Sequence, residues 1–589
     1  MTEFIIGPAG SGKSTLIAKK IADRLSAGRR VILIVPEQSA VSAEAMVCSE
    51  AQSRGIPQTE LEILNFRRLC NRVFRQYGGI AYNSVTPGAK ALIMWQALFS
   101  SAPALKRYRN ELADAKKFIP LLLSAVSEFK AYGITPSMLS DAAKEAEEDD
   151  KALSEKLSDL SLICSAYSHF AERGFSDPSD DLTRLAEVLS ENRFFEGVDL
   201  FLDSFVGFTP QEFSVLSYAF RQADNVTVSL CLSDDDGAFA FENVKKTFDG
   251  LKRLSERHRG EAVVTKLPGT VRFSSEALSF LEKNLWSPGK CRAFEGDCTP
   301  IRTVVAEGAY SEAEFVANDI LTKVIAGAAY RDFAVIARDI KSYSGIIDAV
   351  FAETGLPCHI SERAELSEKP VFKLILSAFG IKNNGWNTAD IVSYMKTGLS
   401  PVTPDECDTI ESYAYQWSIS GKRWYDGEDW FMNPDGFTDV MTEEGMKTLD
   451  EINAVRKKIV DPLSKLFESF DGTRTVRELC RAVWVFLHEV GADEKISSSG
   501  DPDEIRLWNS MCDSLDTLVT VLPEVKADTV LFANLLTLVV DQTNVGNLPS
   551  VIDEISLGSA GLMRTGNVKH VYLLGVNEGV FPAACGENG

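Results

Sequence analysis

The chain has 589 residues, of which 45% are hydrophobic and 25% charged, an ordinary composition for a soluble globular protein. At roughly 150 residues per domain, this length predicts about four domains. The formal net charge of −23 excludes a protein coated in basic surface, although a local positive groove can still lie on an acidic body.

Several classes of protein are disfavoured by features that are missing. No run of about 18 apolar residues occurs, so we expect no membrane span. The N-terminus leads directly into an apolar strand, so we expect no signal peptide. The 11 cysteines include no C-x-x-C, and the closest pair, Cys291 and Cys298, has no nearby histidine. We therefore predict reduced thiols in a cytoplasmic protein, with neither disulfides nor a zinc site.

A phosphate-binding loop is predicted at the N-terminus. The sequence GPAGSGKS, residues 7–14, fits G-x-x-x-x-G-K-[ST] and lies between an apolar strand and a stretch of helical period. The glycines let backbone N–H groups turn toward phosphate oxygens, and the helix N-terminus adds a favourable dipole. Lys13 would reach the β- and γ-phosphates, and the Ser14 hydroxyl would bind Mg²⁺. The alternative is a chance glycine turn. The predicted ATP-binding residues are Gly7, Gly10, Gly12, Lys13, Ser14 and Thr15.

Apolar strands and helices alternate in the first part of the chain. Strands are predicted at 31–35 and 61–64, and later at 198–203 and 225–232, with Asp203 closing the third of these. Between them, amphipathic helices are predicted at 89–99, 118–132 and 153–173. The acidic run at 145–150 reads as a solvated loop or helix end. Residues 267–300 have the composition of a linker.

A second unit of the same kind is predicted to begin near Ile301. Strands are expected at 303–306 and 332–337, the latter ending at Arg338, with a helix at 311–325. Residues 380–545 have helical patterning, and a last strand is expected at 570–575. Because the chain stops soon after that strand, we expect it to be truncated.

The predicted fold class is α/β, with two parallel-sheet domains in tandem, each interrupted by an all-helical insertion. The predicted divisions are 1–85 with 195–275 for the first sheet domain, 86–194 for its insertion, 276–300 for a linker, 301–380 with 546–589 for the second sheet domain, and 381–545 for its insertion.

This arrangement resembles superfamily 1 helicases of the UvrD/RecB type, whose two sheet domains are RecA-like. It resembles most the AddB family, the second subunits of bacterial AddAB helicase–nucleases. The matching stretches are IIGPAGSGKST, IVPEQ, ILNFRRL, FVGFTPQE, DFAVIARD, YMKTGL, GKRW and LGVNEGVFPA. The resemblance implies a role in resecting double-strand breaks for recombinational repair, with an AddA-like partner and contacts to single- and double-stranded DNA. It also implies that the nuclease and its iron–sulfur cysteines lie outside these residues.

The resemblance also shows which parts of a helicase motor are missing. Asp203 matches the aspartate that holds Mg²⁺, and Arg338 matches an arginine that reaches the γ-phosphate from the second domain. Ser204 stands where active helicases carry the glutamate that orients the attacking water. The motifs G-D-x-x-Q and H-x-x-K-G-L-E are replaced by residues 233–239 and 558–563. We therefore assign no catalytic residue and expect Mg-ATP to bind but to be hydrolysed poorly, since loss of a base costs ~10²–10⁴-fold in rate.

Single-stranded DNA is expected at the strand ends of the first sheet, where superfamily 1 helicases hold it. Aromatic side chains stack on bases and arginines neutralise phosphates. In AddB proteins this face recognises the hotspot sequence Chi. Asn71 and Ala40 fall where relatives can carry an aromatic residue and a threonine, which leaves the hotspot open. The candidate DNA-binding residues are Gln38, Phe66, Arg68, Phe205 and Phe208.

Other interpretations remain open at this stage. Phe66 and Phe208 can instead pack in the core, and Arg72 and Arg75 can form a solvated helix face. Trp417 and residues 421–424 can contact duplex DNA or the partner, or be buried. The alternative function is an active 3′–5′ translocase of the UvrD type, and a further one is an unrelated phosphate-loop kinase or small-molecule ATPase.

Overall fold

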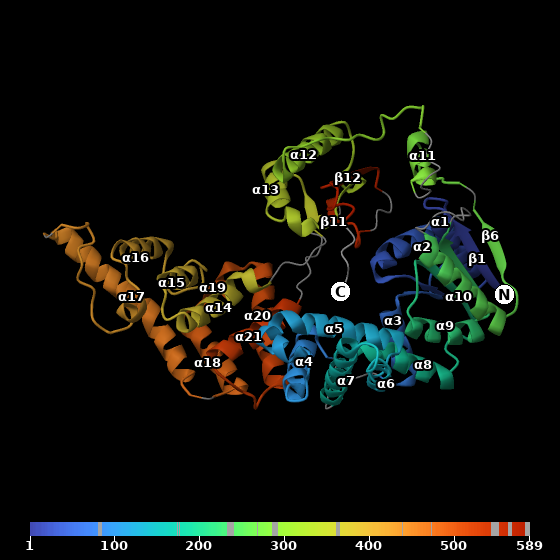
Figure 1. Cartoon of the computed structure of the whole chain (residues 1–589). Coiled ribbons are helices and arrows are strands. Elements are labelled where there is room, and N and C mark those ends of the chain that lie inside the picture. Colours follow the sequence, from blue (N-terminus) through green and yellow to red (C-terminus); the bar gives the residue numbers. More distant parts are fainter. Residues whose placement is uncertain are drawn as a thin grey trace.

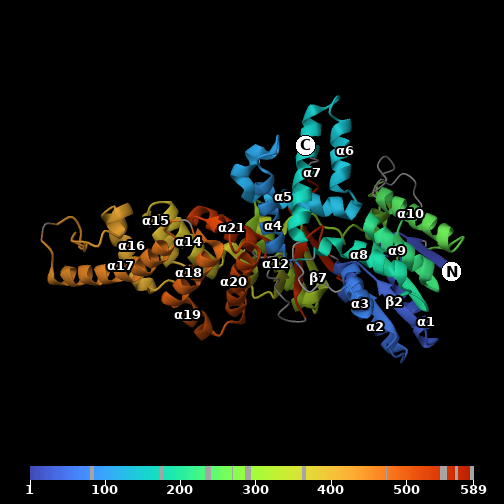
Figure 2. The same ribbon diagram turned by 90° about the horizontal axis from the view of Figure 1, so that it is seen from below.

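The structure is a computed structural model of the whole chain (Figure 1). It describes residues 1–79, 85–172, 175, 177–232, 241–267, 269–285, 293–360, 366–438, 440–472, 474–543, 553–563 and 568–583. Figures 1 and 2 show two sheet-containing parts and a long helical body beside them. This agrees with the predicted α/β class, with parallel sheets and a majority of helix.

The first sheet has six parallel strands in the order β3-β2-β4-β5-β1-β6. Their side chains alternate between two helical layers. Ile5 and Leu33 face α1 (Lys13–Ser26) and α2 (Ala40–Ser53), whereas Phe4 and Ile34 face α3, α8, α9 and α10. The strands are β1 (Thr2–Gly7), β2 (Arg30–Ile34), β3 (Leu61–Leu64), β4 (Val198–Phe205), β5 (Asn225–Cys231) and β6 (Val263–Lys266). The helices on the second face are α3 (Phe66–Tyr77), α8 (Asp181–Glu191), α9 (Pro210–Gln222) and α10 (Glu242–His258).

The second sheet has four parallel strands in the order β12-β7-β11-β8. Its buried strand β7 supplies Phe333 and Val335 to a core shared with two helices. The strands are β7 (Phe333–Ala337), β8 (Cys358–Ile360), β11 (Ile555–Ser559) and β12 (His570–Leu574), and the helices are α12 (Ala309–Ile325) and α13 (Ile346–Glu353).

The two helical segments share one hydrophobic core, although about 200 residues separate them in the sequence. Helix α4 (Pro87–Ser101) packs on α20 and α21. Helices α4 and α21 come so close at Gly88 that a Cβ built there would lie only 2.8 Å from Cγ1 of Val539. The other helices are α5 (Ala115–Tyr132), α6 (Pro136–Glu145), α7 (Lys151–Ala171), α14 (Pro370–Asn383), α15 (Thr388–Met395), α16 (Pro404–Gln416), α17 (Glu443–Ser469), α18 (Val476–Glu489), α19 (Ala492–Ser499), α20 (Pro502–Val521) and α21 (Thr529–Gln542).

Most of the predicted elements are present within a few residues of their expected bounds, and the acidic run at 145–150 follows the end of α6. The strand predicted at 303–306 is wrong, because these residues form no regular structure and Val305 is 96% exposed. Helix α8 lies within the predicted insertion 86–194 but packs in the core of the first sheet. Strands β6, β8 and β11 were not predicted, and helix α11 (Glu276–Asn284) lies in the predicted linker.

Two expectations from composition also hold in the described part of the chain. No helix there is both long and apolar enough to cross a membrane. The nine cysteines that the structure describes are all free thiols.

A buried carboxylate joins the helical body to the first sheet. Asp177, just before the turn that leads into α8, pairs with Nζ of Lys90 on α4 at 2.6 Å and with Nζ of Lys130 on α5 at 2.8 Å. The hydroxyl of Tyr167 on α7 donates to it at 3.2 Å. Burial alone would raise the pKa of Asp177, but the two lysines hold it well below its usual range. Helices α4, α5 and α7 are thereby held to one carboxylate, which lies just before a helix of the first sheet's core, α8.

Replacing Asp177 with Asn should lower the free energy of unfolding by about 3 kcal/mol, because the two part-buried lysines lose the negative charge that they share. Thermal unfolding of Asp177→Asn is the measurement, with Asp141→Asn, which removes an exposed pair with Lys144, as the control. The folded pKa of Asp177 is depressed, so its contribution is complete above the unfolded value of about 4 and is lost as the pH falls below it. Equal unfolding temperatures for the two variants would contradict a stabilising role of the Asp177 ion pairs.

Candidate functional site

At two positions of the phosphate loop, the backbone has a conformation that only glycine adopts without strain. Gly10 has φ +74° and Gly12 has φ +84°, both in the left-handed region. Gly12 is also the N-cap of α1, and no side chain caps that end of the helix. The backbone N–H groups of the first turn of α1, which contains Lys13, Ser14 and Thr15, therefore have no acceptor within the helix and no side-chain cap, as at helix ends that bind anions.

Lys13 is folded back onto the loop. Its Nζ donates to the carbonyl oxygens of Gly7 at 2.9 Å and Pro8 at 2.7 Å, and to Oγ of Ser11 at 3.3 Å. Burial lowers the pKa of Lys13, while the nearby Cys231 and Asp203 raise it. The carbonyl contacts keep the ammonium group at the mouth of the loop, where it can turn to a phosphate oxygen.

The carboxylate predicted to hold Mg²⁺ lies on β4, beside the loop. Asp203 is buried, and both of its oxygens accept hydrogen bonds, Oδ1 from the hydroxyl of Ser229 on β5 and Oδ2 from the hydroxyl of Ser204 at 3.3 Å. It is also near enough to Lys13 to affect that group's pKa. Lys13, which follows β1, and Asp203, on β4, thus lie at the same, carboxyl edge of the parallel sheet, where only β5 separates the two strands.

Ser204 has an unusual backbone. Its φ of +67° is one of only three positive values among the non-glycine residues that the structure describes. The register between β4 and β5 shifts between Leu202 and Phe205, so Ser204 lies in a bulge. This bulge is where the resemblance to active helicases leads us to expect a catalytic glutamate, and the side chain there is a short hydroxyl that hydrogen-bonds its neighbour Asp203.

The second sheet carries the remaining predicted nucleotide residue. Arg338 follows β7 and is exposed. No hydrogen bond or ion pair joins it to the phosphate loop within the described residues. Residues 233–239, which replace one helicase motif, lie outside the described residues. In the other replaced motif, Ser559 is buried at the end of β11 and its hydroxyl accepts from the Ile340 N–H at 3.1 Å.

Three of the predicted DNA-binding residues form an aromatic cluster at the carboxyl edge of the first sheet. The ring centroids of Phe205 and Phe208 lie 4.5 Å apart, and Phe66 meets them edge-on at 5.9 and 6.2 Å. Phe66 and Phe205 are buried, each 8% exposed, whereas Phe208 is half-buried. Core packing therefore accounts for Phe66 and Phe205 in this structure, and of the three only Phe208 presents much surface.

The polar candidates lie at the surface of the same edge. Gln38 and Arg68 are exposed. Helix α3 places Arg68 in its first turn, where the side chain of Asn65 caps the Arg68 N–H at 2.7 Å. Arg72 instead pairs with Glu62 at 2.7 Å, which gives it a structural role, and Arg75 is exposed.

Two charged residues at the loop escaped the sequence analysis, because they lie in the segment assigned to a linker. Arg272 packs against Gly10, and Glu282 on α11 lies near Lys13. Neither belongs to a recognisable motif, so only the tertiary structure brings them to the site.

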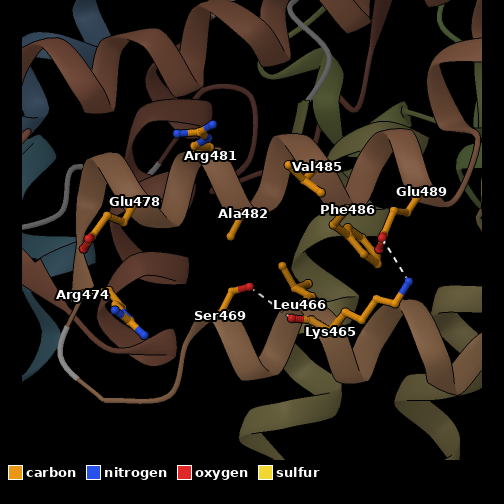
Figure 3. Close-up of a pocket in the computed structure, with 10 residues that line it drawn as sticks. All are labelled: Lys465, Leu466, Ser469, Arg474, Glu478, Arg481, Ala482, Val485, Phe486 and Glu489. Carbon is orange, nitrogen blue, oxygen red and sulfur yellow. Dashed lines mark hydrogen bonds and ion pairs between the residues drawn. The ribbon is translucent and has the colours of Figure 1, made fainter.

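The helical body holds the predicted tryptophans and a separate groove. Trp424 and Trp430 are buried, and Trp417 is half-buried and donates to the Asn433 carbonyl oxygen at 3.2 Å, so packing accounts for these residues. The groove, between α17 and α18, is shown in Figure 3. Lys465 spans it to pair with Glu489 at 3.1 Å. Both views place these helices far from α1 (Figures 1 and 2), so the groove is distinct from the phosphate loop.

Comparisons with known proteins identify relatives over the whole chain. Residues 4–282 match the family model described as ADDB, N-terminal. The chain is 31% identical over 618 residues to the B-type subunit of the ATP-dependent helicase/deoxyribonuclease of Clostridium tetani, an alignment that covers 100% of this chain and 53% of the relative. The corresponding subunit of Caldanaerobacter subterraneus is 30% identical over 610 residues, covering 100% and 52%. That of Acetivibrio thermocellus is 29% identical over 610 residues, covering 100% and 53%. The chain spans about half the length of the curated relatives it matches, and the resemblance to AddB is confirmed.

Replacing Ser204 with Gly should stabilise the protein by about 1 kcal/mol, because glycine adopts the left-handed backbone without steric cost. Ser204→Ala is the matched control, since it removes the same hydroxyl but keeps the strain. We expect a higher unfolding temperature for the Gly variant only. Equal shifts in both variants would mean that the hydroxyl, and not the backbone, decides the effect.

Proposed function

From the AddB N-terminal domain that the chain carries at residues 4–282, we propose that this protein is a subunit of a heterodimeric helicase–nuclease that processes double-strand DNA breaks for recombinational repair. Its partner is an AddA-like helicase–nuclease subunit. The names of the relatives, each a B-type subunit of an ATP-dependent helicase/deoxyribonuclease, support this assignment. The chain's own share of the work is to bind ATP and single-stranded DNA.

The residues at the end of β1 suit ATP with Mg²⁺. The loop offers backbone N–H groups and Lys13 to the phosphates, and a hydroxyl at Ser14 with a carboxylate at Asp203 is a donor set that Mg²⁺ accepts. Bound Mg²⁺ would neutralise phosphate charge. The chain's own residues would orient the triphosphate, with Lys13 turning from the loop carbonyls to a phosphate oxygen.

The proposed motor is degenerate, and Ser204 is the observation that carries this part of the proposal. A neutral serine hydroxyl is too weak a base to take a proton from water, and its alkoxide form is not populated at neutral pH, whereas a glutamate carboxylate can orient and activate that water. The Ser204 hydroxyl is also committed to Asp203. The runner-up function, an active 3′–5′ translocase, requires another residue to take this role.

Single-stranded DNA would lie across the carboxyl edge of the first sheet. Arg68 and Gln38 are exposed there and can contact phosphates or base edges. Phe208 is the aromatic candidate with surface to offer a base. On an acidic protein, a site built from one or two arginines and an aromatic ring favours stacking together with charge over charge alone.

Lys13→Ala should weaken nucleotide binding by about ten- to a hundredfold, the effect of losing a charge-assisted hydrogen bond to phosphate. The measurement is titration of the chain with a fluorescent ATP analogue in the presence of Mg²⁺. Lys19→Ala, which removes an exposed lysine from the same helix, is the control and should bind as the parent does. Unchanged affinity in Lys13→Ala would remove the phosphate loop from the proposal.

Arg68→Ala should lower the affinity for a single-stranded oligonucleotide and reduce the slope of log affinity against log salt by about 0.7, the loss of one phosphate contact. Arg193→Ala is the control, because Arg193 is exposed shortly before β4 begins, at the opposite edge of the sheet. Phe208→Leu should weaken binding with no change in the salt slope. An Arg68 variant with the parent's affinity and slope would contradict this site.

A further inference from the structure

A loop at the end of the helical body holds apolar side chains out in solvent. Residues 425–442, called here the aromatic loop, connect Trp424 to the start of α17. Within this loop, Phe431, Phe437 and Val440 are 81%, 80% and 80% exposed. Single exposed apolar residues are common on protein surfaces, but several on one short loop are typical of a surface that binds a partner.

Hydrogen bonds to the helical body fix the backbone on both sides of Phe431. The preceding residue, Trp430, is buried, and its N–H donates to Oδ1 of Asn453 on α17 at 2.8 Å. The Trp430 carbonyl oxygen accepts from Nδ2 of Asn453 at 3.0 Å. On the other side, the carbonyl oxygen of Met432 accepts from the hydroxyl of Tyr413 at 3.0 Å. The exposure of Phe431 is therefore a property of an anchored loop.

A buried asparagine organises the second half of the aromatic loop. Nδ2 of Asn433 donates to the hydroxyl of Thr438 at 2.9 Å and to the carbonyl oxygen of Val440 at 3.3 Å. The ring of Phe437 lies edge-on to that of Trp417, with the centroids 4.8 Å apart. A partner that binds these rings meets a loop that is already ordered, which lowers the entropic cost of association.

The aromatic loop and the first turn of α17 are strongly acidic. Residues 425–446 contain seven Asp or Glu and no Lys or Arg. Asp429 pairs with Lys457 on α17 at 3.0 Å. A surface of this kind repels phosphate groups and attracts the cationic side chains of a protein. The exposed carboxylates that form no ion pair within the described residues are those of Glu428, Asp435, Glu443 and Glu444.

We propose that the aromatic loop is a docking site for the partner subunit of the heterodimer, which binds Phe431 and Phe437 in an apolar pocket edged by Lys or Arg. This inference rests on the proposed function and names the surface that the partner contacts. Aromatic residues inside a polar rim are typical anchors of protein interfaces. Figures 1 and 2 show the start of α17 at the end of the helical body farthest from both sheets. A subunit docked there leaves the phosphate loop and the proposed DNA-binding edge free.

Charge disfavours two other occupants of the aromatic loop. DNA would bring its phosphates beside four carboxylates that have no counter-charge. A second copy of the chain could offer the groove between α17 and α18, where Arg474 and Arg481 are exposed. Two chains that each carry a net charge of −23 repel one another, however. A different subunit with a basic surface meets neither cost.

The test is a titration of the chain with the AddA-like subunit of the same organism. Phe431→Ala and Phe437→Ala are compared with Tyr132→Ala, which removes a 59% exposed ring at the end of α5. We expect each Phe variant to bind the subunit about ten- to a hundredfold more weakly than the parent, the effect of losing an interface anchor. The Tyr132 variant should bind as the parent does. Because both Phe rings are exposed, all three variants should keep the parent's unfolding temperature.

A second pair of variants tests the acidic rim. Glu428→Lys should slow association with the subunit several-fold, because the mutated side chain would face the cations that edge the pocket. Glu148→Lys makes the same charge change at an exposed site in the acidic run at 145–150 and should leave the rate closer to that of the parent.

The outcomes separate this inference from the proposed function. Binding of the subunit by both Phe variants with the parent's affinity would overturn the docking site and leave the heterodimer standing. A parent chain that does not bind the subunit would overturn the heterodimer and this site with it. Sedimentation of the chain alone and titration with duplex DNA test the other occupants. Self-association or DNA binding that Phe431→Ala abolishes would also overturn the inference.

Discussion

The backbone of the phosphate loop is the constraint on which the rest of the site depends. Its left-handed turns at Gly10 and Gly12 point N–H groups to one place. The close approach of Arg272 to Gly10 and of Leu267 to Gly7 leaves no room for a side chain on either glycine. The same few atoms therefore shape the proposed anion site and anchor the segment that leads to the second sheet.

Local sequence was enough to predict the parts that are encoded locally. The phosphate loop, the buried strands β2 to β5 and most long helices follow from apolar runs and periodicity. The failures were non-local. Val304 and Val305 form an apolar run with no strand beside it, whereas the short edge strand β6 has mostly exposed residues and forms only by pairing with β1. At the site, the burial of Phe66 and the contact of Arg272 with Gly10 depend on partners far along the chain.

The helical segments are one body in this structure, not two independent attachments. Their common core and the close contact of Gly88 with Val539 join a part inserted in the first sheet domain to a part inserted in the second. The ion pairs of Asp177 with Lys90 and Lys130 then fix that body to the first sheet. Two features therefore link the first and second sheets in the described part of the chain: the segment that carries α11, and the hydrophobic core that the two helical segments share.

We propose above all that the chain keeps a phosphate loop that binds nucleotide but has Ser204 in place of the glutamate that would activate water. The most direct measurement is steady-state ATP turnover by the purified chain, with and without single-stranded DNA, beside the same measurement on Lys13→Ala. The account predicts saturable nucleotide binding with turnover no faster than that of the Lys13 variant, whether or not DNA is present. Rapid turnover that DNA stimulates and that Lys13→Ala abolishes would contradict it.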